Sequence, residues 1–437
     1  MMNGSIQLCA SMGKELDCLL SVFTVPSGQH FLALAAGWVL GRGRRTITAM
    51  LRAAGLSSGQ HYSAFYRFFS KAVWSECLLW RAWATMLVGT FYPTGDIFYC
   101  GDDTLLKHRG PKIHGAGIFR DAVLSTHRMT VFHWGHNWVV LALVVRFSFW
   151  PDRCFALPIN ARLRVKGEET KTAVELMQDM FQEVAQWFPG RRNVFCVDGT
   201  YSNLAGHLPS DSILIGRLRW DAALYRVPRQ RCRHRAGRPR KNGTPLPSPK
   251  KVATATSTAW KRLRVQTYGK RRTVEVHSFT GIWAKVSYQL IRVVLVRDPA
   301  TPQDVQCFFC TDVGRPLCWI IETYARRWSI ERMFEDAKQF LGIEHPQTRT
   351  VRSVLRVAPM GLIMYGAVIM WYGKHRRFSQ DYRKDPWYSF KEHASFRDML
   401  AAVRSSSFHE HIFCASTLPA QMQKIIRQLL QTVAEAA

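Results

Sequence analysis

Four polar side chains between residues 324 and 338 recur at helical intervals. At 100° per residue they fall within roughly 60° of one another on one helix face: Tyr324, Arg327, Glu331 and Lys338. A neighbouring face is apolar and can anchor the helix in a core, through Ile330, Met333, Phe334, Ala337 and Leu341. A carboxylate flanked by Arg and Lys suits a group that holds a metal ion while cations bind phosphates. The alternative is a solvent-exposed helix face with i,i+4 ion pairs. If only one such pair of charged residues were present, this alternative would be the better interpretation.

Two upstream segments carry aspartates that could complete such a site. Residues 96–104 predict a strand that runs into Asp102 and Asp103, and residues 192–198 predict a second buried strand that ends at Asp198. An acid at the end of a buried strand is costly unless its charge is compensated, and a bound cation is one solution. Two aspartates and a glutamate are hard oxygen ligands of the kind that Mg²⁺ and Mn²⁺ prefer. Taken singly, each aspartate could equally cap a helix or close a turn.

The spacing Tyr-(two)-Arg-(three)-Glu-(six)-Lys resembles the signature of bacterial insertion-sequence transposases of the DDE superfamily. Each position is matched, by Tyr324, Arg327, Glu331 and Lys338. Asp102-Asp103-Thr104 and the Val-Asp-Gly-x-Tyr at 197–201 resemble the segments that carry the other two acids of that family. In the family the first catalytic aspartate directly precedes the threonine, which favours Asp103. Residues 110–123 and 134–139 also resemble the DDE superfamily endonuclease subgroup, and the resemblance runs from about residue 30 to about residue 375.

The resemblance implies a DNA transposase that cleaves the terminal inverted repeats of an insertion element and joins the 3′-OH ends to target DNA. It implies that Asp103, Asp198 and Glu331 are the catalytic residues and hold two Mg²⁺ ions, for which Mn²⁺ can substitute. Arg327 and Lys338 would bind phosphates, and Tyr324 would contact a phosphate or orient Glu331. The implied partners are double-stranded DNA and a second subunit in a synaptic homodimer. Alternatives are another RNase H-like DNA endonuclease and a domesticated, non-transposing DNA-binding derivative.

Charge and hydropathy agree with a polyanion partner. The chain has 437 residues, a formal net charge of +29 and 47% hydrophobic residues, which is typical of a basic globular protein. The electrostatic field of such a positive charge attracts polyanions, of which nucleic acid is the first candidate and an anionic membrane a distant second. No N-terminal stretch is ordered like a signal peptide, and the longest apolar runs, near residues 360–372 and 138–145, fall short of the ~20 residues that span a bilayer. We therefore expect no membrane partner and a cytoplasmic, nucleoid-associated bacterial protein.

The eleven cysteines show no spacing typical of a disulfide framework, as expected for a reduced cytosolic protein. Cys307 and Cys310, followed by Cys318, allow a zinc interpretation. No second CxxC and no pair of histidines follows at ligand spacing, and the segment alternates like a strand. We therefore favour inert cysteines in a core strand.

The order of expected elements predicts an α/β protein with an RNase H-like catalytic domain, in which helices flank a mixed sheet. The fold name comes from the resemblance. We expect five regions: an N-terminal helical DNA-binding region (1–90), the first part of the catalytic domain (91–215), a basic loop with a β-rich insertion (216–310), the second part with the Glu331 helix (311–375), and a C-terminal helical region of open role (376–437). The finer elements expected are a helix over 168–188, strands over 273–284, 289–297 and 305–310, and an apolar helix over 359–372 beneath the sheet.

The N-terminal region contains a possible helix-turn-helix. A helix over residues 46–54 is stopped by Gly55, and another begins near residue 61. Generic packing of two helices is the alternative from the residues alone, and the resemblance favours DNA binding. The candidate contacts are Arg44, Arg45, Tyr66 and Arg67.

A strongly basic run follows Asp221. No acidic residue and sixteen Lys and Arg lie between Asp221 and Glu275, and the centre of the run has no apolar period, so we expect a mobile loop. Residues 237–239 resemble the centre of an AT-hook, but a non-specific phosphate clamp is the better interpretation. The candidate DNA contacts are Arg229, Arg231, Arg233, Arg235, Arg238, Arg240 and Lys241.

Overall fold

The structure is a computed structural model of the 437-residue chain. It describes residues 6–56, 61–126, 128–167, 170–228, 241–375, 386–413 and 420–435. Up to residue 91, the described residues are mainly helical, as the sequence predicts, and form α1 (Ala10–Leu20), α2 (Val25–Leu40), α3 (Ile47–Ala53), α4 (Ser63–Ser70) and α5 (Glu76–Phe91). Thr46 and Ser75 cap α3 and α5, since their side chains accept hydrogen bonds from backbone N–H groups of the first turn.

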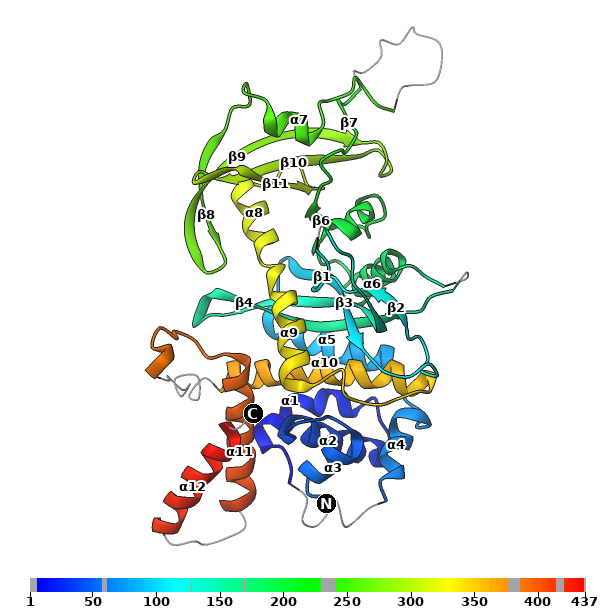
Figure 1. Ribbon diagram of the computed structural model, residues 1–437, viewed down its shortest axis with the longest axis vertical. Coiled ribbons are helices and arrows are strands. Elements are labelled where there is room, and N and C mark those ends of the chain that lie inside the picture. Colours follow the sequence, from blue (N-terminus) through cyan, green and yellow to red (C-terminus); the bar gives the residue numbers. More distant parts are fainter. Residues whose placement is uncertain are drawn as a thin grey trace.

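One mixed sheet of eleven strands runs through the molecule (Figure 1). Its strands are β1 (Ile97–Lys107), β2 (Gly117–Arg120), β3 (Phe132–Phe147), β4 (Trp150–Arg164), β5 (Asn193–Val197), β6 (Ser212–Arg217), β7 (Leu224–Tyr225), β8 (Lys261–Thr267), β9 (Lys270–Trp283), β10 (Gln289–Asp298) and β11 (Thr301–Cys310). The main path follows the order β2-β3-β1-β5-β6-β11-β10-β9-β7, with β4 paired to β3 and β8 to β9. Strands β1, β5 and β6 are parallel, and β3 is antiparallel to β1. The fold is therefore mixed α/β, as expected.

The β-rich segment after residue 216 continues this sheet. Strand β11 pairs antiparallel with β6, with Phe309 opposite Gly216. Strand β8, which the sequence analysis did not separate from the basic run, pairs with β9 over seven residue pairs. The segment that we expected as an insertion is thus joined to the catalytic strands by backbone hydrogen bonds.

The other described helices and short 3-10 turns follow along the chain. They are α6 (Ala173–Trp187), η1 (Gly199–Gly206), α7 (Pro249–Thr254), α8 (Leu317–Ala325), α9 (Trp328–Leu341), α10 (Val351–Lys374), η3 (Pro386–Tyr388), α11 (Phe396–Phe413) and α12 (Ala420–Glu435). Helix α6 begins later than expected, because Thr172 and Glu175 form a capping box that fixes its first turn. Glu168 and Glu169, the first two residues of the expected helix over 168–188, lie outside the described residues.

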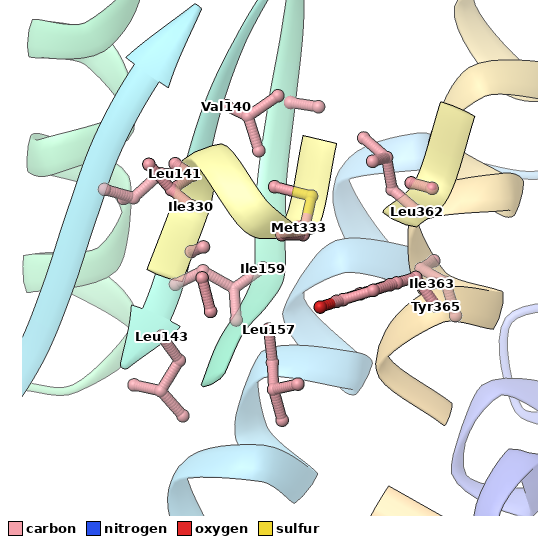
Figure 2. Packing of buried hydrophobic residues seen from close by; sticks show 14 of the residues in the cluster. Val140, Leu141, Leu143, Leu157, Ile159, Ile330, Met333, Leu362, Ile363 and Tyr365 are labelled. Carbon is pink, nitrogen blue, oxygen red and sulfur yellow. The ribbon is translucent and has the colours of Figure 1, made fainter. Parts of the chain in front are cut away.

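The apolar face of α9 is the main anchor of the candidate site. Its expected core residues Ile330, Met333, Phe334, Ala337 and Leu341 are all buried. Figure 2 shows Ile330 and Met333 beside residues of β3, β4 and α10, including Val140, Ile159 and Leu362. Packing on both sides fixes the rotation of α9, which determines where its polar face points.

Helix α10 lies across the centre of the molecule, between the sheet and the N-terminal helices (Figure 1). It starts earlier than the expected helix over 359–372 and continues through Pro359. Its 24 residues, with a mean hydropathy of 1.6 in the best window, are long and apolar enough to cross a membrane, but 94% of that window is buried inside the protein. Burial of this kind is typical of a core helix.

Candidate active site

The polar stripe predicted for one helix is divided between two helices. Helix α8 ends at Ala325 and α9 begins at Trp328, with Arg327 at the N-cap position of α9. Tyr324 therefore belongs to α8, whereas Glu331 and Lys338 belong to α9. The break changes which of the four side chains can meet.

Arg327 joins two acids that are far apart in the sequence. Its Nη1 donates to Oδ2 of Asp102 at 3.0 Å, and its Nη2 donates to Oε1 of Glu331 at 2.6 Å. The Arg327 side chain is 14% exposed, and those of Asp102 and Glu331 are 18% and 35% exposed. Charge-assisted bonds that are partly shielded from water are stronger than surface ion pairs. One guanidinium thus holds the β1 acid and the α9 acid on the same side of the sheet.

Asp103 has different partners. Its Oδ1 accepts a hydrogen bond from the Tyr201 hydroxyl at 2.9 Å, and its Oδ2 accepts one from the Asn137 amide at 2.7 Å. Adjacent residues of a strand point to opposite faces, so only one of Asp102 and Asp103 can approach Arg327 and Glu331. The structure brings Asp102 there. This geometry moves our preference for the first catalytic aspartate from Asp103 to Asp102.

Asp198 lies at the end of β5, which is parallel to β1 and pairs Val197 with Gly101. Its carboxylate caps the following 3-10 turn by accepting from the Thr200 backbone N–H at 2.9 Å. The capping role and the strand-end role that the sequence left as alternatives are therefore both present. The parallel pairing places Asp198 beside the acidic part of β1, since adjacent strands lie about 4.8 Å apart.

Burial and nearby like charges raise the pKa values of two of the acids. Burial and the nearby Asp198 raise the pKa of Asp102 to about 7, although Arg327 opposes the shift. Burial also raises the pKa of Asp198. Burial alone would lower the pKa of Arg327, but Tyr324, Asp102 and Glu331 outweigh it and raise the pKa. The group is a set of crowded carboxylates around one permanent cation, and perturbation of this kind is common at functional sites.

Tyr324 and Lys338 lie at the two ends of this group. The Tyr324 ring is buried against Phe308 at 4.4 Å between ring centroids, and the Arg327 guanidinium lies 5.7 Å from the Tyr324 ring centroid. Lys338 Nζ donates to the backbone carbonyl of Leu105 on β1 at 2.8 Å, and burial lowers the pKa of Lys338. The predicted stripe therefore extends from a buried tyrosine to a lysine tied to β1.

The donor set fits a hard divalent cation, because Asp102, Asp198 and Glu331 offer only carboxylate oxygens. Among the residues that the structure describes, no three His, Cys, Asp or Glu side chains are arranged as a group that could hold a metal ion. Arg327 lies between Asp102 and Glu331 and bonds to both. A metal ion shared by these two acids would therefore compete with the Arg327 guanidinium.

Cys307 and Cys310, the residues of the weak zinc pattern, are buried on β11. Burial raises the pKa of each thiol to about 12, which opposes the thiolate form that binds zinc. Cys318 lies partly exposed in α8.

The other proposed DNA contacts differ in position. Arg44, Tyr66 and Arg67 are exposed. Arg45 is buried and donates to the carbonyls of Trp38, Gly43 and Phe340. We therefore assign Arg45 a structural role and withdraw it as a DNA contact. Lys241 lies 4.9 Å from the ring centroid of Tyr288. Arg229, Arg231, Arg233, Arg235, Arg238 and Arg240 lie outside the described residues.

Asn137 and Asp121 are site neighbours that the sequence analysis did not single out. Asn137 faces Asp103, and Asp121 accepts from Lys107 at 2.9 Å and from His133 at 3.2 Å. Asn137 belongs to the quoted run 134–139, and that run was the available signal for it.

A family model described as DDE superfamily endonuclease matches residues 18–277, which is more than half of the chain. The chain belongs to the DDE superfamily endonucleases. Enzymes of this family generally depend on a divalent metal, which agrees with the carboxylates around Arg327. The match includes both aspartate strands and ends before Glu331, so the role of Glu331 depends on its spacing and on its contact with Arg327.

No curated protein matches this chain. One solved structure that is similar is the cryo-EM structure of the piggyBac transposase synaptic complex with hairpin DNA. The two sequences are 10% identical, the alignment covers 91% of this chain and 74% of that one, and the TM-score is 0.41.

Proposed function

We propose that this DDE endonuclease is a transposase with an RNase H-like catalytic domain that cleaves the terminal inverted repeats of an insertion element and joins the 3′-OH ends to target DNA. The observation that carries the proposal is the meeting of Asp102 and Glu331 at Arg327, across 225 residues of sequence. These contacts unite the aspartate segment with the Tyr-Arg-Glu-Lys spacing in one place. A synaptic homodimer on double-stranded DNA and a bacterial cytoplasmic location belong to the same proposal.

Asp102, Asp198 and Glu331 are proposed to hold two Mg²⁺ or Mn²⁺ ions. When bound, such ions lower the pKa of the attacking water or 3′-OH and offset charge on the leaving oxygen. Arg327 is proposed to leave its acids and bind a phosphate next to the scissile bond with its two-pronged guanidinium. Asp103 is proposed as a positioning residue that holds Tyr201, and through it the loop after Asp198.

The test is a cleavage and strand-transfer assay on duplexes that carry the element ends. Nicking with Mg²⁺ or Mn²⁺, none with EDTA, and joining of the nicked 3′ ends to a second plasmid would support the transposase. Cleavage without joining would instead support the alternative of an RNase H-like endonuclease. DNA binding with no cleavage under any metal would support a domesticated binding derivative.

A further inference from the structure

A cavity of about 880 Å³ with several charged lining residues lies where the N-terminal helices meet the end of β1. Its walls come from three parts of the chain: the segment before α3, the end of β1 with the start of β3, and the turn after α9. The lining residues on which the argument depends are Arg44, Lys107, Arg109, Trp134, Glu344 and His345. Of these residues, only Arg44 was named above as a candidate DNA contact, and the cavity itself has no role in the proposed cleavage chemistry.

Several hydrogen bonds fix the walls. Buried Arg45 bonds to the Phe340 carbonyl at 3.0 Å, and its backbone N–H lies 3.3 Å from the His345 ring, which holds the Arg44 segment against the end of α9. Lys107 N–H donates to the Glu344 carboxylate at 2.9 Å. A cavity whose walls are joined in this way is ready for a ligand without a large ordering cost.

The cavity is rich in available positive charge. Arg44 and Arg109 are exposed, and within the described ranges no ion pair to an acid engages either of them. Lys107 is paired with Asp121 at 2.9 Å, and the carboxylate of Glu344, the acid in the wall, already accepts the Lys107 N–H. Two free guanidinium groups in one concave surface suit phosphate, because each can donate two parallel hydrogen bonds.

Trp134 adds an aromatic surface. It is partly exposed in the cavity, and its indole N–H donates to the Gly110 carbonyl at 3.1 Å, which fixes the ring against the loop after β1. Cations that follow a backbone, combined with an aromatic ring for stacking, are typical of sites for single-stranded nucleic acid. A cavity of this volume admits a strand end, whereas a duplex is too wide to enter.

The cavity also lies in line with the acids. Asp102 and Lys107 are five residues apart on β1, a rise of about 17 Å, and Lys338 meets β1 at Leu105, between them. A DNA strand that runs from Asp102 and Glu331 alongside β1 passes Lys338 before it reaches Arg44 and Arg109.

We propose that this cavity binds the phosphates and a stacked base of a single DNA strand, the unpaired segment next to the site of cleavage. The inference extends the proposed function and rests on it for the direction of the strand, but the binding itself does not depend on cleavage.

The test uses fluorescence anisotropy in EDTA, so that no cleavage occurs, with a blunt duplex and with the same duplex carrying a single-stranded tail. The Arg44→Ala, Arg109→Ala double variant should bind the tailed duplex about tenfold more weakly than the natural protein does. Its loss on the blunt duplex should be clearly smaller, because only Arg44 is also a candidate contact to duplex DNA. The slope of log affinity against log salt for the tailed duplex should fall by about 1.4, at about 0.7 for each lost contact to a single strand. Trp134→Leu should weaken tail binding alone, with an unchanged salt slope.

Lys14→Ala with Arg81→Ala is the matched control, since it removes two exposed cations on α1 and α5 outside the cavity. Equal losses on tailed and blunt DNA, or equal losses in the cavity and control variants, would overturn the proposal. Because the assay has no catalytic step, failure of cleavage in the separate nicking assay would leave this result intact.

Discussion

Arg327 donates a hydrogen bond of 3.0 Å to Asp102, a residue 225 positions earlier in the chain. With its second bond to Glu331, this contact places a permanent positive charge among the acids that we propose as metal ligands. The arginine compensates partly buried carboxylates that would otherwise repel one another. It also competes with any ion that those carboxylates bind, and the first two predictions separate these effects.

Asp102→Asn and Asp103→Asn should differ sharply. Asp102→Asn removes a charged oxygen beside Glu331, and we expect cleavage to fall by at least about 100-fold. Asp103→Asn can keep an oxygen acceptor for Tyr201 and, after rotation of the Asn137 amide, a partner for Asn137, so we expect a loss of about tenfold at most. Single-turnover nicking rates check this, and similar rates for Asp102→Asn and the natural protein would return the first-acid role to Asp103.

Arg327→Gln should raise the affinity for Mn²⁺ in the absence of DNA while cleavage falls. The variant removes the cation that competes with metal, and it also removes the proposed phosphate contact. Titration of Mn²⁺ by electron paramagnetic resonance measures the first effect without cleavage. Arg332→Gln is the control, because Arg332 pairs with Glu335 on an exposed part of α9. An Mn²⁺ affinity equal to that of the natural protein would contradict the competition.

Asp336 should make stability depend on pH. Burial raises its pKa from 3.8 to about 6, although Arg332 and Arg153 oppose the shift. Between about pH 4 and pH 6 the unfolded chain has lost this proton and the folded chain retains it, so stability falls as pH rises. Asp336→Asn should therefore match the natural protein at pH 4 and exceed it by about 2–3 kcal/mol above pH 7. Melting temperatures at several pH values check this, and a constant difference would contradict it.

Arg356 should be a major stabilising residue of the N-terminal helices. Its side chain is 4% exposed, pairs with Glu76 at 2.7 Å, donates to the carbonyls of Phe69, Ala72 and Trp74, and lies 4.1 Å from the Trp74 ring centroid. Arg356→Met leaves Glu76 and those carbonyls without their donor, and we expect a loss of about 3–5 kcal/mol. Exposed Arg352→Met should change stability by less than about 0.5 kcal/mol. Denaturant unfolding of both variants provides the comparison.

The sequence predicted the elements of the site better than the directions of their side chains. The apolar spacing of α9 identified its buried face, because helical period and burial agree there. The choice between Asp102 and Asp103 could not be made in the same way. Both faces of β1 are covered, so alternation gives no sign of which side bears Glu331.

Arg45 shows a second limit of the sequence. Because Arg45 is a cation beside Arg44 and next to a helix, its position in the sequence is typical of a DNA contact. Its guanidinium nevertheless donates to backbone carbonyls that are distant in the sequence, such as that of Phe340. Local spacing carries no information about such distant acceptors. The break at Arg327 is similar, because Arg326 packs 5.4 Å from the Phe98 ring centroid whereas Arg327 turns to the acids. Arg326 and Arg327 are adjacent and of the same residue type, and only their tertiary surroundings determine that they have different contacts.

The central position of α10 has a consequence for how the chain is made. Helices α1, α2, α4, α5 and α9 and strand β4 all contact α10, and all precede it in the sequence. On the ribosome these elements are complete while the helix that fills the space between them has not yet emerged. Nascent chains shorter than about 375 residues must therefore expose the apolar surfaces that α10 later covers, and such surfaces bind chaperones or aggregate.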